Sequence, residues 1–301
     1  MASRERILME EVLFEPPLVI EKKKKEKFRL ALFLFLMTMI TTLFAGAFLS
    51  GADPLRHPWE ITKGISFSLT LMIILLSHEL GHYLACRRYG VDASLPYFIP
   101  APPYPFIIGT FGAFIKMRSP VIYKKALFDI AVAGPIAGFI LSCGALVMGI
   151  PLSEVTAKTP DPQDISFGNS PIFYFLVHQL IGSLPEGYYI DLHPIAFAGW
   201  IGLFVTCLNL IPIGQFDGGH LTYALFGKRH RMISVLTVIL LMFAGFFGWP
   251  GWWIWGLLGA FIGLRHPPLE DQEIKLGSGR VMIGWLSLLI FIGTFILIPF
   301  S

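Results

Sequence analysis

Apolar residues gather in seven stretches along the chain, and the segments between them are mostly short and polar or rich in glycine and proline. Most of these stretches approach the roughly 20 residues that an α-helix needs to cross the hydrocarbon core of a bilayer. The pattern therefore predicts an all-α polytopic membrane protein with six to seven transmembrane helices. The predicted spans are residues 30–50, 61–86, 124–150, 194–213, 231–247, 250–264 and 281–298.

One apolar segment, residues 95–119, departs from this pattern because it contains five prolines. Proline inside a helix removes a hydrogen bond and clashes with the preceding turn, so this segment cannot be a straight span. Irregular backbone at membrane depth must be buried in protein or line a cavity. We expect a membrane-dipping loop or short β-hairpin with residues 109–113 at its inner part. A hydrophobic linker that lies on the membrane interface is the alternative.

Composition and charge support a membrane chain and indicate its orientation. Apolar residues make up 54% of the 301 residues and charged residues 14%, against roughly 25% charged residues in soluble proteins. The lysines at 22–25 lead into the first span, which is typical of a cytoplasmic flank and not of a nucleic-acid site. With residues 1–29 in the cytoplasm, 20 of the 23 Lys and Arg residues fall on the cytoplasmic side. We therefore expect a multi-pass protein of the cell membrane with a cytoplasmic N-terminus.

The second predicted span carries the sequence His-Glu-Leu-Gly-His at residues 78–82. His78 and His82 stand one helical turn apart on the same face, so both imidazoles can bind a single metal ion. Glu79 lies beside that ion, where it can act as the general base for an attacking water. Ionisable side chains inside an apolar helix are costly, so these three residues are functional candidates.

A catalytic zinc needs a third protein ligand and an open fourth position. The candidate is Asp217, which follows Pro212 and Gly214 at the cytoplasmic end of the fourth span. Proline and glycine interrupt the helix there and allow the carboxylate to turn inward. The second and fourth spans run in the same direction, so both motifs are expected at a similar depth, nearer the cytoplasmic face.

These motifs together resemble the site-2 protease family of intramembrane zinc metalloproteases, peptidase family M50. His-Glu-Leu-Gly-His at 78–82 and Asn-Leu-Ile-Pro with Phe-Asp-Gly-Gly-His at 209–220 carry the resemblance, and residues 128–138 are similar to the family's third core span. The match covers roughly residues 60–230. Gln215 and Phe216 depart from the family pattern. Residues 151–193 are too few for a PDZ insert, as in the compact subgroup that includes plastid and cyanobacterial relatives.

The resemblance implies roles for individual residues. His78, His82 and Asp217 would bind one Zn²⁺ per chain, Glu79 would be the catalytic base, and Asn209 would contact substrate or help to stabilise the oxyanion. The segment at 109–113 is similar to the family's membrane-dipping hairpin, which could bind an unwound substrate as an added strand. The substrate-binding residues implied on it are Gly109, Thr110, Phe111 and Gly112.

The function implied by the resemblance is hydrolysis of peptide bonds within or next to transmembrane segments of membrane-protein substrates, in regulated intramembrane proteolysis. The expected domains are a basic cytoplasmic segment at 1–29 and a transmembrane metalloprotease domain at 30–298, with its core at 60–230 and C-terminal helices at 231–298. Partners would be transmembrane proteins and the lipid bilayer, without nucleic acid; the oligomeric state stays open. A divalent-metal or proton transporter that uses the same His, Glu and Asp residues is the alternative, and a non-catalytic scaffold is another.

Four further polar residues receive simpler interpretations. Asp129 lies one helical turn from Lys125 and is expected to pair with it. His220 follows Asp-Gly-Gly at a predicted helix start, and His230 and His266 flank spans and are expected at the interface.

Overall fold

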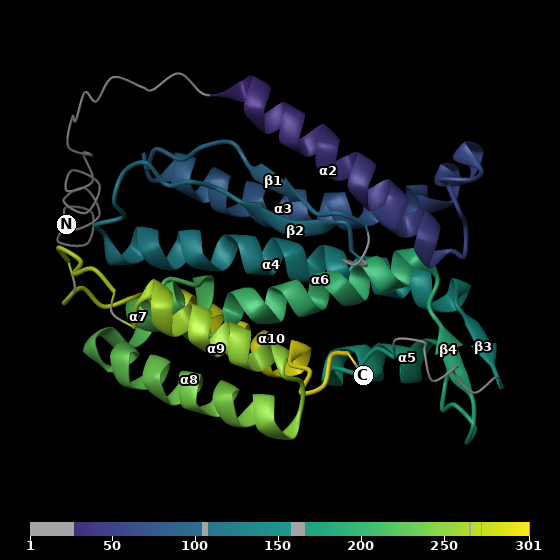
Figure 1. Cartoon of the computed structure of the whole chain (residues 1–301). Helices are drawn as coiled ribbons and strands as arrows, with labels where there is room; N and C mark the ends of the chain where they lie inside the picture. Colours follow the sequence, from purple (N-terminus) through teal and green to yellow (C-terminus); the bar gives the residue numbers. More distant parts are fainter. Residues whose placement is uncertain (1–26, 104–107, 158–165, 265, 272, 301) are drawn as a thin grey trace, which may run out of the picture.

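The computed structural model describes residues 27–103, 108–157, 166–264, 266–271 and 273–300, so most of the predicted basic segment at 1–29 lies outside the described residues. Helices dominate the fold (Figure 1). They are α2 (Phe28–Leu49), α3 (Ile65–Arg88), α4 (Lys124–Gly149), α5 (Pro171–Leu180), α6 (Pro194–Leu210), α7 (Asp217–Phe226), α8 (His230–Phe247), α9 (Gly251–Ile262) and α10 (Ser278–Thr294), with 3-10 turns η1 (Pro58–Gly64), η2 (Ile150–Leu152) and η3 (Gly227–Arg229).

The prediction of an all-α polytopic membrane protein is confirmed, and a helix occupies most of each predicted span. The helices that are long and apolar enough to cross a membrane are Phe28–Leu49, Pro58–Arg88, Lys124–Leu152 and Asp217–Phe247. Helices α6 and α10 have 17 residues each, which is about 26 Å at 1.5 Å per residue and slightly less than the bilayer core. The exact number of crossings therefore stays a prediction.

Helices α3, α4 and α6 form the centre of the bundle, and α4 contacts both of its neighbours (Figure 1). Helix α2 covers α3 on one side, and α10 packs on α6. Helices α8 and α9 form an antiparallel pair that is connected by residues 248–250. Large side chains such as Phe67, Leu146 and Trp200 are fully buried between these helices and form the core.

The ends of the helices divide between two faces of the bundle. Helix α3 ends, α4 begins and α7 lies at one face, while α5, β3 (Glu154–Thr156) and β4 (Tyr189–Asp191) lie at the other (Figure 1). Strands β3 and β4 pair antiparallel. Arg87, Arg88 and Lys124 stand at the first face. The charge pattern of the sequence predicts that this face is cytoplasmic.

The proline-rich segment forms a β-hairpin, which confirms the predicted hairpin and argues against a simple linker. Strand β1 (Tyr97–Pro100) pairs antiparallel with β2 (Thr110–Phe114). Gly109 has φ 74°, in a left-handed region that favours glycine. The hydroxyl of Thr41 on α2 donates to the Gly109 carbonyl oxygen at 2.7 Å. Helix α2 thus fixes one strand end of the hairpin.

The predicted pairing of Asp129 with Lys125 is wrong. Arg280 at the start of α10 donates from both Nε and Nη2 to the Asp129 carboxylate, each at 2.8 Å, and the Tyr89 hydroxyl donates to it as well. A guanidinium offers two parallel donors that match a carboxylate, an arrangement that a lysine one turn away does not provide. The contact joins the ends of α3 and α10 to α4.

Candidate metal centre

The two histidines of α3 lie side by side in the interior of the bundle. His78 is 4% exposed and His82 6%, although both stand in a helix that is otherwise largely apolar. Their Nε2 atoms are 3.1 Å apart. This proximity follows from helix geometry, because residues at i and i+4 occupy the same face one turn apart.

Asp217 reaches this pair because the chain breaks between α6 and α7. Helix α6 ends at Leu210, just before Pro212, and Asp217 is the first residue of α7. A Cβ added to Gly218 would lie 2.0 Å from the Leu210 carbonyl oxygen, so only glycine lets α7 begin this close to the end of α6. The Oδ2 atom of Asp217 consequently lies 3.1 Å from Nε2 of His82 and 3.4 Å from Nε2 of His78.

The hydrogen bonding of His82 presents its Nε2 as a metal ligand. Its Nδ1 lies 2.8 Å from the carbonyl oxygen of Ile130 on α4. A carbonyl only accepts, so Nδ1 carries the hydrogen and the neutral ring has its lone pair on Nε2. Ligand atoms of His78, His82 and Asp217 all lie within 4.8 Å of one another. Two imidazoles and one carboxylate are a donor set that fits zinc.

Two glycines of α4 make room for the histidine rings. A Cβ on Gly134 would lie 2.1 Å from Nε2 of His82, and one on Gly138 would lie 3.1 Å from Nδ1 of His78. Sequence reasoning did not assign these glycines to the site, nor the Ile130 carbonyl. The signal that could have found them is the Ala-Gly-Pro-Ile-Ala-Gly sequence at 133–138, whose glycines stand at i and i+4 like the histidines.

Glu79 is buried beside the ligand group without belonging to it. It is 7% exposed and lies within electrostatic reach of His78, His82 and Asp217, and its carboxylate contacts the backbone N–H of Ile115. Ile115 directly follows β2, so the hairpin meets α3 at this carboxylate. Asn209, in the last turn of α6, places Nδ2 3.3 Å from Nε2 of His78.

The other predicted site residues lie on the hairpin. The Thr110 hydroxyl donates to the Ile99 carbonyl oxygen at 2.8 Å and ties β2 to β1. Phe111 is 57% exposed, and Gly112 has open space where a Cβ would be. Gly109 lies against α2. The structure thus gathers His78, Glu79, His82, Asn209 and Asp217 at one point. The predicted hairpin residues precede Ile115, whose backbone contacts Glu79.

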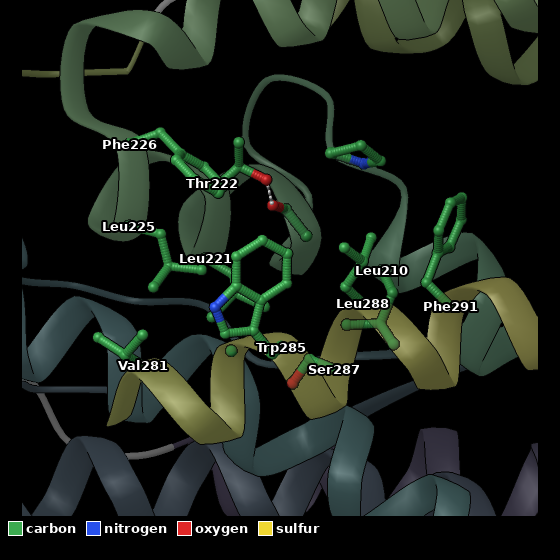
Figure 2. A pocket seen from close by; sticks show the side chains of 13 residues that line it. Leu210, Leu221, Thr222, Leu225, Phe226, Val281, Trp285, Ser287, Leu288 and Phe291 are labelled. Carbon is green, nitrogen blue, oxygen red and sulfur yellow. Dashed lines mark hydrogen bonds between the residues drawn. The ribbon is translucent and has the colours of Figure 1, made fainter. Parts of the chain in front are cut away.

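A cavity of about 190 Å³ lies next to this point, between α7 and α10 (Figure 2). Most of its lining is apolar, and Trp285 stands between the two helices. Leu210 and Gly218 reach the cavity from the positions that adjoin Asn209 and Asp217. The Thr222 hydroxyl donates to the Gly218 carbonyl oxygen at 2.6 Å and braces the first turn of α7 (Figure 2).

The sequence model of Peptidase family M50 matches residues 66–247, a segment that holds both histidines, Glu79 and Asp217. The chain belongs to this family. As an M50 member it is similar to the probable zinc metalloprotease EGY1, chloroplastic, of Oryza sativa subsp. japonica, with 34% identity over 63% of this chain and 33% of the relative.

Two further relatives of this M50 chain extend the match. The probable zinc metalloprotease EGY2, chloroplastic, of Oryza sativa subsp. indica is 30% identical over 80% of this chain and 44% of the relative. The probable zinc metalloprotease EGY3, chloroplastic, of Oryza sativa subsp. japonica is 32% identical over 70% of this chain and 38% of the relative. The chain therefore spans between a third and a half of the length of these relatives. No solved structure matches.

Proposed function

We propose that this chain is an intramembrane zinc metalloprotease that hydrolyses peptide bonds within or next to transmembrane segments of membrane-protein substrates. One Zn²⁺ would be bound by His78, His82 and Asp217. The observation that carries the proposal is the convergence of these three ligand atoms within 4.8 Å, with Glu79 buried beside them.

Each of the remaining polar groups has a step in this reaction. Zinc held by His78, His82 and Asp217 would supply Lewis-acid chemistry, for the scissile carbonyl and for the attacking water. Glu79 takes a proton from the attacking water and transfers it to the leaving amine. The Asn209 side-chain N–H donates to the carbonyl oxygen as negative charge develops on it. Burial of the site strengthens both interactions, since few competing waters and a low dielectric surround them.

The hairpin would bind the substrate. A transmembrane helix hides its carbonyl groups in internal hydrogen bonds, so it must unwind locally before attack. Strands β1 and β2 form a two-stranded antiparallel sheet, and an extended peptide can add to the edge of such a sheet. Gly109, Thr110, Phe111 and Gly112 lie on or next to this strand, and Ile115 at its end contacts Glu79. An added strand would therefore run toward the base.

The same proposal includes the membrane arrangement. The charge pattern supports a cytoplasmic N-terminus in the cell membrane, with the site nearer the cytoplasmic face. Residues 30–298 would form the protease domain, with its core at 60–230. Residues 231–298 would form the C-terminal helices, of which α10 lines the cavity beside Asp217.

The test is cleavage of a defined transmembrane substrate by the purified protein in liposomes. Glu79→Gln keeps the shape of the side chain and removes the base, so cleavage should fall by at least about a hundredfold while the zinc content is unchanged. Glu154→Gln on the exposed strand β3 is the matched control and should cleave normally. Undiminished cleavage by Glu79→Gln, or zinc flux without any cleavage by the unmodified protein, would contradict the proposal; flux would favour a transporter.

A further inference from the structure

His220 lies next to the metal centre but outside its ligand group. It stands in the first turn of α7, three residues after Asp217, and residues at i and i+3 share one face of a helix. It is within electrostatic reach of both Asp217 and His82. Its Nδ1 is 2.8 Å from Nε2 of His266, which belongs to the loop between α9 and α10. The two histidines are 46 residues apart in sequence, and their contact was not expected.

The loop that carries His266 is fixed against α4 and α7. The backbone N–H of Glu270 donates to the Ile122 carbonyl oxygen at 3.0 Å, and that of Lys124 donates to Oδ1 of Asp271 at 2.6 Å. The Tyr223 ring stacks on the His266 ring with centroids 4.2 Å apart. These contacts hold the imidazole of His266 in place beside His220.

The hydrogen bonds of the pair determine its tautomers. Nδ1 of His266 lies 2.8 Å from the Pro267 carbonyl oxygen, so Nδ1 carries the hydrogen. Burial lowers the pKa of His266, which favours a neutral ring whose Nε2 accepts. His220 must then donate from Nδ1, and its own lone pair lies on Nε2. One end of the pair is therefore a proton acceptor, Nε2 of His220 on α7. The other end is an N–H group, Nδ1 of His266, next to the exposed Pro267.

We propose, on the basis of the hydrolysis proposed above, that His220 and His266 form a proton relay between the cleavage site and water at the α9–α10 loop. Hydrolysis first gives a carboxylic acid and a neutral amine. These products then ionise: the acid loses one proton and the amine gains one. A site inside a bilayer has little bulk water for either exchange, so a path through side chains is useful there.

The relay balances these two transfers. Nε2 of His220 takes the proton of the product carboxyl group, the Nδ1 proton of His220 passes to Nε2 of His266, and the Nδ1 proton of His266 passes to water. One proton enters the pair and one leaves, so its charge is unchanged and both tautomers are inverted. The reverse transfer from water delivers a proton to the amine and restores both tautomers. Glu79 keeps its separate role in the attack of water.

Other ionisable groups face the pair and would contribute to any pH profile. They are Asp217 and Tyr223 on the same helix as His220, His82 on α3 and His230 at the start of α8. His230 is buried, bonds Ser234 through Nε2 at 3.2 Å and has its ring 6.3 Å from that of His266. A pH profile alone cannot separate these residues, so the test uses chemical rescue.

The experiment replaces His266 by Ala in the full chain and measures cleavage of the transmembrane substrate in liposomes with added imidazole or 1-methylimidazole. Both molecules fit the space of the lost ring, but only imidazole has an N–H and can both accept and donate a proton. We expect kcat to fall about tenfold or more with unchanged KM and zinc content. Imidazole should restore most of the rate, and 1-methylimidazole should not. His178→Ala on α5 is the matched control and should show neither effect.

A second variant guards against a loss of packing. His266→Gln can still accept the hydrogen bond from His220 but cannot pass a proton on, so it should remain slow. Full activity of either variant, equal rescue by both imidazoles, or no rescue by imidazole would overturn the relay. Absence of cleavage by the unmodified protein in the same liposomes would contradict the proposed hydrolysis itself, which distinguishes the two failures.

Discussion

Gly134 on α4 lies so close to His82 on α3 that a Cβ at this position would come within 2.1 Å of the ring nitrogen Nε2. Nδ1 of the same ring donates its hydrogen to the Ile130 carbonyl oxygen. The lone pair of the neutral ring therefore lies on Nε2. One turn of α4 thus both orients the histidine and leaves space for its ring. The metal centre depends on a helix that supplies none of its three candidate ligands.

Gly134→Ala should therefore damage zinc binding from outside the ligand set. The added methyl group has no space unless the His82 ring moves, so we expect zinc content well below one per chain and a proportional loss of cleavage. Gly138→Ala, with 3.1 Å to His78, should have a smaller effect. Gly144→Ala is the control, because a Cβ there meets nothing within 4 Å. Metal analysis of the three variants checks this order, and full zinc in Gly134→Ala would contradict it.

Zinc should stabilise the folded chain through Asp217. A ligand that binds only the folded state adds about 2.7 kcal/mol at a concentration of 100 times Kd. We expect removal of metal with a chelator to lower the Tm in detergent and added zinc to restore it. Asp217→Ala should lose this response, because it removes the anionic ligand. Asp191→Ala on β4 should keep it; an equal response of both variants would show that zinc binds elsewhere.

The contact between Arg280 and Asp129 should stabilise the packing of α10 on α4. Both side chains are less than one third exposed, at 29% and 27%, and a hydrogen bond to a charged group contributes about 1.5–3 kcal/mol. Asp129→Asn and Arg280→Gln should each lower unfolding stability by about this amount, with the double variant well short of the sum. The pair Lys63–Glu60 on the surface is the control, and its coupling should be much weaker because solvent screens it. Additive losses at Asp129 and Arg280 would contradict the prediction.

Hydropathy predicted the helices well because each apolar span has to satisfy its own backbone hydrogen bonds in lipid. The His-Glu-x-x-His spacing predicted the approach of His78 to His82 for the same local reason. Asp217 was predicted only by combining its motif with the orientation of two spans. Its distance to His82 depends on the break at Pro212 and the glycines that follow, which fix how closely α7 begins beside α6.

Outside the metal centre, contacts between distant side chains were not predicted. Asp129 was assigned to Lys125 because only the neighbour on its own helix is visible in one sequence, whereas Arg280 is 151 residues away. His230 and His266 were expected at the membrane interface because the sequence shows only that they flank predicted spans. The loop between α9 and α10 folds back on α4 and brings His266 to His220, and no periodicity of the chain encodes that fold.

The hydroxyl of Thr41 should matter for substrate binding and not for zinc. It donates to the Gly109 carbonyl oxygen at 2.7 Å and so links α2 to the residue that precedes β2. Thr41→Val keeps the shape of the side chain and removes this hydrogen bond, whose net contribution is about 1 kcal/mol. The β2 edge would then be less well ordered, so KM for a transmembrane substrate should rise about fivefold while kcat and zinc content stay close to those of the unmodified protein. Thr237→Val on α8 is the control, because its hydroxyl bonds within its own helix to Ile233. A fall in zinc content, or an unchanged KM, would mean that α2 does not position the hairpin for substrate.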